Sequence, residues 1–233
     1  YGWVVVLCAF TLMFVGFGVA YSFAAFFRAF QAEFGASRAH VSLVFSLCAL
    51  LWFSFGVPGG LLADRFGPLG VCLAGVLCIA AGLAAAAHAS SLMALYVAYS
   101  VGIGVGIGLS YVPAVAAVQH WFVQRRVLAG GIAVSGIGAG NLLLPPLAAW
   151  WIELWGWRGA YLGLMALTLL AAVPAALLLG GRAALRAKAA GATLPGMTLR
   201  EAMRSKLFWL MYAVAMLLCV GFFVPMVHLV PYA

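Results

Sequence analysis

Apolar residues form seven long runs along the chain, and short polar stretches separate them. The runs cover 3–27, 41–62, 69–88, 92–118, 128–152, 160–179 and 207–230. A helix needs about 20 mostly apolar residues to cross the hydrocarbon core of a bilayer, and each run reaches that length. The pattern therefore predicts an all-α, polytopic membrane protein.

Composition supports this prediction. Only 7% of the residues are charged and 67% are hydrophobic, whereas a soluble domain carries about 25% charged residues. A water-soluble globule and a disordered chain are therefore excluded. The net charge of +8 does not indicate a nucleic-acid partner, because the basic residues lie between the apolar runs rather than on one folded face.

The basic residues predict the orientation of the chain. The longest polar connection, 181–206, contains six of the twelve Lys and Arg residues. Arg65, Arg125 and Arg126 lie in connections on the same side, which gives nine basic residues on that side against three on the other. Since positive charge accumulates on the cytoplasmic side, we expect a cytoplasmic N-terminus.

The order of the runs predicts three parts. Residues 1–180 form a six-helix transmembrane domain, 181–206 a cytoplasmic linker, and 207–233 the first helix of a second, truncated domain. Thr198 and Glu201 have the spacing of a capping box, which indicates a short interfacial helix in the linker. The sequences at 18–21 and 108–111 are alike, which suggests 3+3 inverted repeats. We therefore expect the chain to be a fragment, the N-terminal half of a twelve-helix protein plus one further span.

Polar residues inside the runs are the candidates for substrate binding, because they are costly in lipid. Lys, Arg, Asp and Glu are absent from the centres of the runs. We predict that Tyr111, near the middle of the fourth run, lines a cavity. Tyr21, Asn141 and His228 are further candidates, for which aromatic packing, a satisfied polar contact or an interfacial position is the alternative.

Two residue types indicate packing rather than chemistry. Gly102, Gly104, Gly106 and Gly108 lack the third glycine of a dinucleotide motif, so they form two small-residue faces for close helix packing. The five cysteines lie inside apolar runs without the spacing of metal ligands. We expect no metal, no cofactor and no enzymatic activity.

The connection after the second run carries a recognisable motif. Gly60 to Gly67 reads Gly-Leu-Leu-Ala-Asp-Arg-Phe-Gly, which is an ordinary interfacial turn or a charged latch. It resembles the loop signature of the major facilitator superfamily, in which Asp64 and Arg65 would latch the cytoplasmic side between Gly60 and Gly67. Pro68 and Leu69 stand where that family has two basic residues.

A second motif resembles the monocarboxylate transporter and oxalate/formate exchanger branch of that superfamily, in its bacterial form. It runs from Pro113 through Trp121 and Phe122 to Arg125, Arg126 and the glycines after them. The resemblance implies alternating-access transport of small organic anions such as lactate or pyruvate, with proton symport or anion exchange. It places Arg125 and Arg126 at the inner mouth and the protein in the cell (inner) membrane.

The chain departs from the branch in its charges. Tyr21 stands where many animal monocarboxylate transporters have a Lys, and the fourth span lacks the Arg of many proton-coupled members. The Asp/Arg pair that the family uses in its eighth span lies beyond Ala233. The implied partners are an organic anion, a proton, lipid and the missing half of the chain.

The sequence also allows other functions. A superfamily carrier of a drug, a sugar or another anion is the first alternative. An intramembrane serine hydrolase is a remote one, because Ala133 stands where a rhomboid-type motif before Ser135 needs Gly. A retinal protein is excluded, because the only lysines, Lys188 and Lys206, lie in or beside the linker.

Overall fold

The computed structural model describes residues 1–122, 124–179, 199–214 and 217–218. These residues are almost entirely helical and contain no strand. Five of their helices are long and apolar enough to cross a membrane. They are Gly2–Phe34, Arg38–Phe66, Pro68–Ala87, Leu92–Trp121 and Arg126–Leu179. The predicted all-α membrane fold is confirmed, and most of the predicted seventh span lies outside the described residues.

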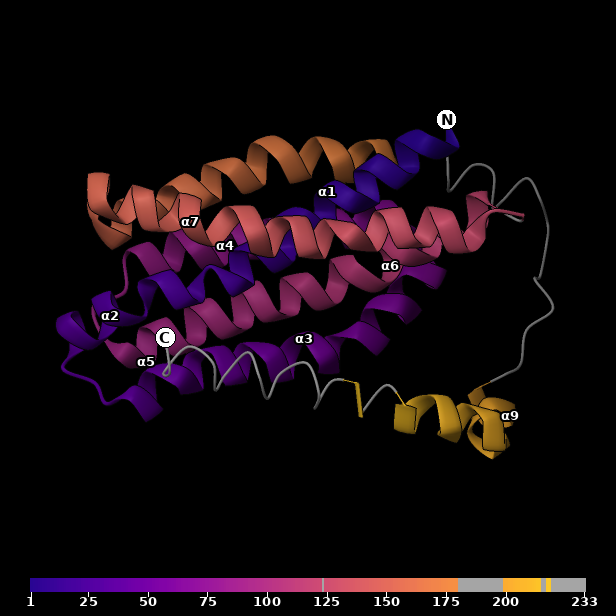
Figure 1. Cartoon of the computed structure of the whole chain (residues 1–233), viewed down its shortest axis with the longest axis horizontal. Helices are drawn as coiled ribbons and strands as arrows, with labels where there is room; N and C mark the ends of the chain where they lie inside the picture. The colour runs from indigo at the N-terminus through magenta and orange to yellow at the C-terminus, as the bar shows by residue number, and fades with distance from the viewer. Residues whose placement is uncertain (123, 180–198, 215–216, 219–233) are drawn as a thin grey trace. The chain divides into compact units, whose positions relative to one another are not determined.

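The fifth of these helices is a hairpin of two spans. It begins with α7 (Arg126–Leu167) and continues through η2 (Thr168–Ala172) to residue 179. A straight helix of its 54 residues would be about 80 Å long, against about 30 Å for the bilayer core. Gly156, with φ 69° and ψ 171°, reverses the chain, as Figure 1 shows at the left end of α7. Spans five and six therefore exist as predicted, but one glycine joins them instead of a polar connection.

The first two spans extend beyond their apolar runs. The first consists of α1 (Gly2–Tyr21) and α2 (Phe23–Phe34), separated only by Ser22. The second, α3 (Arg38–Phe66), begins after Ser37, whose side chain accepts a hydrogen bond from the His40 N–H. The serine cap therefore sets the start of α3, and Gly35 and Gly67, both with positive φ, end α2 and α3 beyond the apolar runs.

The third and fourth spans begin with similar local signals. α4 (Pro68–Ala87) follows Gly67, which has φ 87°, and starts at a proline. α5 (Leu92–Leu95) is capped by Ser91, which accepts from the Ala94 N–H at 3.2 Å. It leads into η1 (Tyr96–Val105), which is wound as a π-helix, and then α6 (Gly106–Trp121). Such π-helical winding is rare and is frequent at functional sites.

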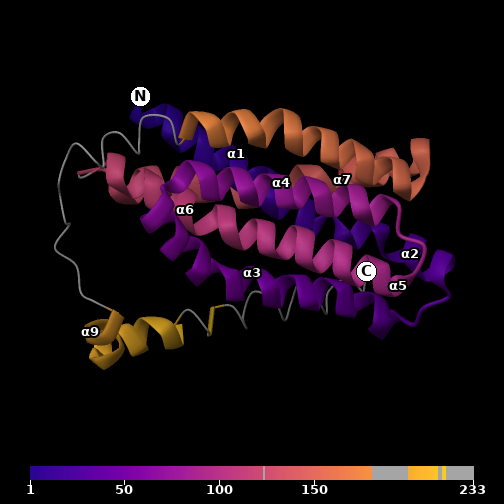
Figure 2. The ribbon, with the colours of Figure 1, turned by 180° about the vertical axis from the view of Figure 1, so that it is seen from behind.

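Spans one to six form one bundle. α6 and η1 pack against both α3 and α4, and α1 packs against α7, an arrangement visible from both sides in Figures 1 and 2. The contacts divide the chain into two units, Tyr1–Ala190 and Gly191–Ala233. The second unit contains α9 (Leu199–Arg204) and a helix over 206–214. Thr198 of the predicted capping box lies outside the described residues.

Glycines bring the spans into backbone contact. A Cβ on Gly82 would lie 2.6 Å from the Cα of Gly102, and a Cβ on Gly75 would lie 2.6 Å from the Gly106 oxygen. The other glycine face meets α3, since a Cβ on Gly104 would lie 2.6 Å from the Cys48 oxygen. The packing interpretation of the glycine run is therefore confirmed, with one face on α4 and the other on α3.

Candidate functional site

Five aromatic side chains from three spans form a continuous cluster, which we call the aromatic wall. Its members are Phe17 and Tyr21 on α1, Phe45 and Trp52 on α3, and Tyr111 on α6. The Phe17 ring is the centre, 5.4 Å from the Tyr111 ring and 5.5 Å from the Trp52 ring, both edge-on. Two predicted site residues, Tyr21 and Tyr111, therefore share one neighbour, although they lie 90 positions apart.

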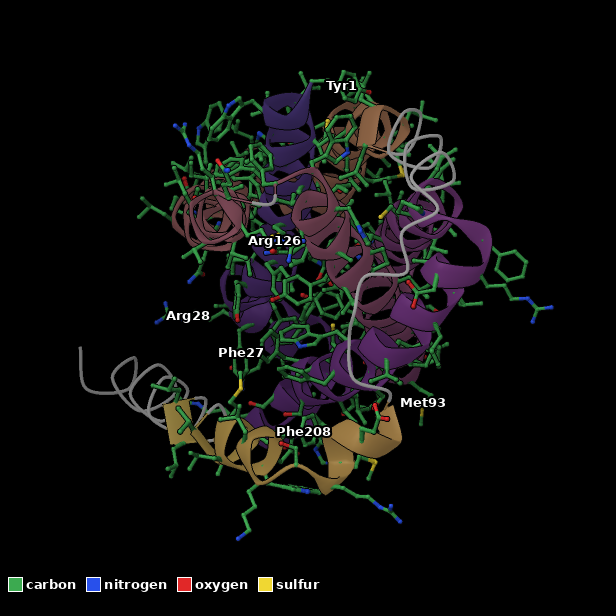
Figure 3. The ribbon with its side chains drawn as sticks, turned by 90° about the vertical axis from the view of Figure 1, so that its right-hand side faces the viewer. Tyr1, Phe27, Arg28, Met93, Arg126 and Phe208 are labelled. Carbon is green, nitrogen blue, oxygen red and sulfur yellow. The ribbon has the colours of Figure 1, made fainter. Side chains whose placement is uncertain are left out.

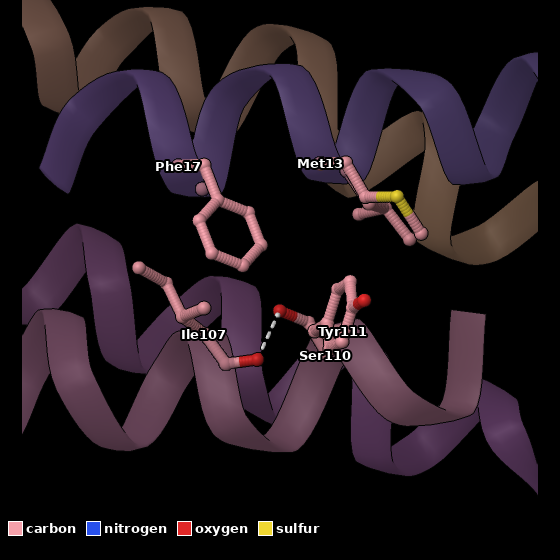
Figure 4. A pocket seen from close by; sticks show the side chains of 7 residues that line it. Met13, Phe17, Ile107, Ser110 and Tyr111 are labelled. Carbon is pink, nitrogen blue, oxygen red and sulfur yellow. Dashed lines mark hydrogen bonds between the residues drawn. The ribbon is translucent and has the colours of Figure 1, made fainter. Parts of the chain in front are cut away.

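A narrow pocket opens between α1 and α6 beside this wall (Figure 4). It has about 170 Å³ of open space, no part of which is wide enough for a water molecule. Its lining comprises Leu12, Met13, Gly16, Phe17, Ile107, Ser110 and Tyr111. The pocket is thus mainly apolar and contributes one wall of a site rather than a closed site.

The two hydroxyls at this pocket differ in their hydrogen bonding. Ser110 donates within its own helix, to the Gly106 oxygen at 2.9 Å and the Ile107 oxygen at 3.3 Å, the second drawn in Figure 4. The half-buried Tyr111 makes a ring contact with Phe17, but its hydroxyl makes no hydrogen bond to any described residue. Tyr111 is therefore the group that is free to bind a ligand oxygen.

Of the other two candidates, the structure describes only Asn141, which is not part of the wall. Asn141 follows Gly140, where α7 touches the Phe14 oxygen of α1, but its amide makes no hydrogen bond within the described part of the chain. His228 lies outside the described residues. Of the four predicted site residues, the structure thus connects two, Tyr21 and Tyr111, which both contact the Phe17 ring.

None of the described residues of the wall or the pocket carries a charge. The single ion pair among the described residues joins Arg158 and Glu33, both at the ends of spans. The wall can offer ring faces and hydroxyl groups to a ligand, but no cation. A carboxylate bound here would need its positive partner from elsewhere, because hydrogen bonds to neutral donors are weaker than charge-assisted ones.

The residues of the predicted cytoplasmic latch gather at one end of the bundle, which we call the Tyr1 end. Tyr1 donates a hydrogen bond to the Leu178 oxygen there, and its ring lies 5.4 Å from that of Trp121. Arg126 Nε donates to the Phe122 oxygen at 2.9 Å, and the Phe122 ring lies 5.2 Å from that of Trp3 at the same end. Figure 3 labels Tyr1 and Arg126 in a view along the bundle. The last turn of α3 also ends there (Figures 1 and 2).

These latch residues are near one end but are not paired. Asp64 forms no ion pair with a described residue, and Arg65 lies over the ring of Phe66, 5.3 Å from its centroid. Gly67 supplies the positive φ that lets α3 turn into α4, whereas a Cβ on Gly60 would lie 3.3 Å from Val112. The turn is therefore formed, while the latch itself stays a prediction.

The opposite end carries a clasp that the sequence did not suggest. Arg158 Nη1 donates to Glu33 Oε1 at 2.8 Å, and Nη2 donates to the Ala89 oxygen at 3.1 Å. The guanidinium also lies 4.2 Å from the centroid of the Trp157 ring. One side chain thus joins the ends of spans one, three and six. The only sequence signal for this clasp was that Glu33 and Arg158 have opposite charges and lie at span ends that are predicted to be on the same side of the membrane.

Loss of this clasp has a graded expected effect. Arg158→Gln should lower the thermal midpoint by a few degrees, and Glu33→Gln by less, because the arginine also holds the Ala89 carbonyl and Trp157. Arg28, an exposed arginine on α2 that points away from the bundle (Figure 3), serves as control through Arg28→Gln. Thermal unfolding in micelles measures all three. Equal losses for Glu33→Gln and Arg158→Gln would contradict the three-way clasp.

The alternative of a serine hydrolase finds no support here. Ser135 is exposed, and its hydroxyl donates to the Ile132 oxygen of its own helix at 2.7 Å. No histidine of the described residues contacts it. General-base chemistry requires a base within hydrogen-bond reach of the nucleophile.

Comparison with known proteins gives consistent matches. The model of the Major Facilitator Superfamily matches residues 6–233. The chain is 36% identical to monocarboxylate transporter 13 of Bos taurus over 232 residues, which is 99% of this chain and 53% of that protein. It is 32% identical to monocarboxylate transporter 11 of Homo sapiens over 237 residues, or 100% and 50% of the two chains. The chain spans about half the length of the curated relatives it matches.

Proposed function

This chain belongs to the major facilitator superfamily, and from this membership we propose that it is the N-terminal half of a secondary carrier for small organic anions. It is a multi-pass membrane protein of a transporter family, not an enzyme. Monocarboxylates such as lactate and pyruvate are the proposed substrates. The observation that carries the proposal is the similarity to monocarboxylate transporters along 99% of the chain.

The geometry of the bundle supports a site shared between two halves. The aromatic wall and the free Tyr111 hydroxyl offer apolar contact and one hydrogen bond. We propose that Tyr111, with Tyr21, forms this half's share of a central cavity, and that Asn141 and His228 border it. The cation for the carboxylate would come from the other half, because these described spans contain no charge at that level.

The remaining assignments follow from the same proposal. Asp64 and Arg65 would latch the cytoplasmic side, with Arg125 and Arg126 at the inner mouth. The nine-to-three distribution of basic residues supports an N-terminus in the cytoplasm. We place the protein in the cell (inner) membrane because its motifs resemble the bacterial form of the transporter branch. We propose that coupling to a proton or to a counter-anion drives the transport.

Transport by the full-length protein in proteoliposomes tests the proposal. We expect uptake of labelled lactate or pyruvate, driven either by an inward proton gradient or by an anion loaded inside the vesicles. Protein-free liposomes are the control for passive entry of the protonated acid. Residues 1–233 alone should give no uptake, because the proposed cavity lies between two halves. A carrier that moves a neutral sugar or a drug and ignores carboxylates would contradict the proposal.

A further inference from the structure

The helix of the first span is interrupted at Ser22, and we call residues 18–22 the joint. The Gly18 oxygen accepts both the Ser22 N–H at 2.9 Å and the Ser22 hydroxyl at 2.7 Å. The Tyr99 hydroxyl donates to the Ala20 oxygen at 2.9 Å. Because side-chain donors compete for helix carbonyls, they bend helices and loosen their hydrogen-bond ladder. The boundary between α1 and α2 falls at this turn.

Two neighbouring spans hold the joint in its present position. Tyr99 belongs to η1, the π-helical part of span four, and its side chain is fully buried. On the other side, a Cβ on Gly18 would lie 3.0 Å from the Gly140 oxygen of α7 and still closer to Leu144. The joint is thus the place where spans one, four and five meet.

Tyr161 packs against Tyr99, the residue that holds the joint, and its own hydroxyl is unsatisfied. It is 1% exposed, and its hydroxyl is the one buried side-chain polar atom of the described residues that lacks a hydrogen bond. Its ring stacks on Phe26 of α2 at 4.2 Å with an interplanar angle of 7°, and lies 6.3 Å from the Tyr99 ring. Almost every buried polar group has a partner, because an unpartnered one loses its hydration without compensation.

We propose that the Tyr161 hydroxyl is the donor for a second position of the joint. When α2 turns about Ser22, Tyr161 donates to a carbonyl of residues 18–22, while Tyr99 releases Ala20. The stack with Phe26 couples Tyr161 to α2, so that the ring follows the helix. Tyr161 is then a positioning residue, and assigning its motion to the transport cycle rests on the proposed function.

The test uses Tyr161→Phe and Tyr99→Phe in the full-length protein. Tyr161→Phe should raise the thermal midpoint, because it removes an unsatisfied hydroxyl from the present position. It should slow hydrogen exchange in the peptide that covers the joint and lower the transport rate roughly two- to tenfold, because the second position loses its hydrogen bond. Tyr99→Phe should lower the midpoint and speed the exchange.

The matched control is Tyr96→Phe. Tyr96 lies in the same π-helical segment and donates to the His40 oxygen at 2.6 Å, away from the joint. Its loss should lower the midpoint slightly and leave exchange at the joint unchanged.

Two outcomes would overturn the inference. A lower midpoint for Tyr161→Phe would mean that the hydroxyl is satisfied in the present position. If Tyr161→Phe raises the midpoint but leaves both hydrogen exchange and transport unchanged, the Tyr161 hydroxyl only destabilises the present position, and the joint has no second position. If the wild-type protein moves no carboxylate, the proposed substrate fails, while the midpoint and the exchange at the joint still decide about the two positions.

Discussion

Gly102→Leu is expected to abolish the folded six-span bundle. The Cα of Gly82 and the Cα of Gly102 face each other across the contact of α4 and η1, so a side chain on either would meet backbone rather than a flexible neighbour. Overpacking a core costs about 1–3 kcal/mol where side chains can give way. Here spans three and four would have to separate, so we expect a larger loss.

The measurement is the yield of monodisperse protein in micelles, with the thermal midpoint for variants that fold. Gly102→Ala should be intermediate, since one methyl group already meets the Gly82 backbone. The control is Gly138→Leu, because Gly138 is an exposed glycine of α7 whose Cβ would meet nothing within 4 Å. A Gly102→Leu protein that folds with a midpoint near that of wild type would refute the close-packing account.

Tyr111→Phe is expected to raise the KM for a carboxylate about 10- to 100-fold. A hydrogen bond to a charged group contributes about 1.5–3 kcal/mol, and each 1.4 kcal/mol is about tenfold in affinity. Stability should not change, because the Tyr111 hydroxyl makes no hydrogen bond to a described residue and the phenyl ring keeps its edge contact with Phe17. The effect on affinity is thus separated from the effect on folding.

Concentration-dependent uptake into proteoliposomes gives the KM, and thermal unfolding in micelles gives the stability. Tyr96→Phe is again the comparison, with the opposite expected pattern of a small loss of stability and an unchanged KM. An unaltered KM for Tyr111→Phe would remove this residue from the proposed site. A lowered midpoint would show that its hydroxyl has a structural partner.

The sequence was sufficient for the class of fold and for the six spans that lie within the described residues. Long apolar runs are a local property, and their length alone determines whether a helix can cross a bilayer. The glycine spacing at 102–108 also determined that span four packs closely, because residues four apart lie on one helix face. The motif from Gly60 to Gly67 carried the resemblance to the major facilitator superfamily, of which the chain is a member.

The ends of the helices and the hairpin of spans five and six could not be predicted from the sequence. The helix of span one continues to Phe34, past the apolar run, because α2 buries Phe30 against Trp157 and Tyr161 of another span. The reversal at Gly156 depends on one positive φ. Such features depend on packing partners and on a single dihedral angle, to which hydropathy is insensitive.

The tertiary structure alone decided which polar side chains are paired and which are free. The sequence singled out Tyr111 and Tyr21 as candidates, but it did not show which intramembrane tyrosine hydroxyls have partners. The structure gives Tyr99 a backbone carbonyl, leaves the hydroxyl of Tyr161 unsatisfied in the core, and puts Tyr111 at a pocket. It likewise joins Glu33 to Arg158, 125 positions away. Burial is encoded residue by residue, but hydrogen-bond partners depend on the depth and rotation of each helix against its neighbours, which only the assembled bundle fixes.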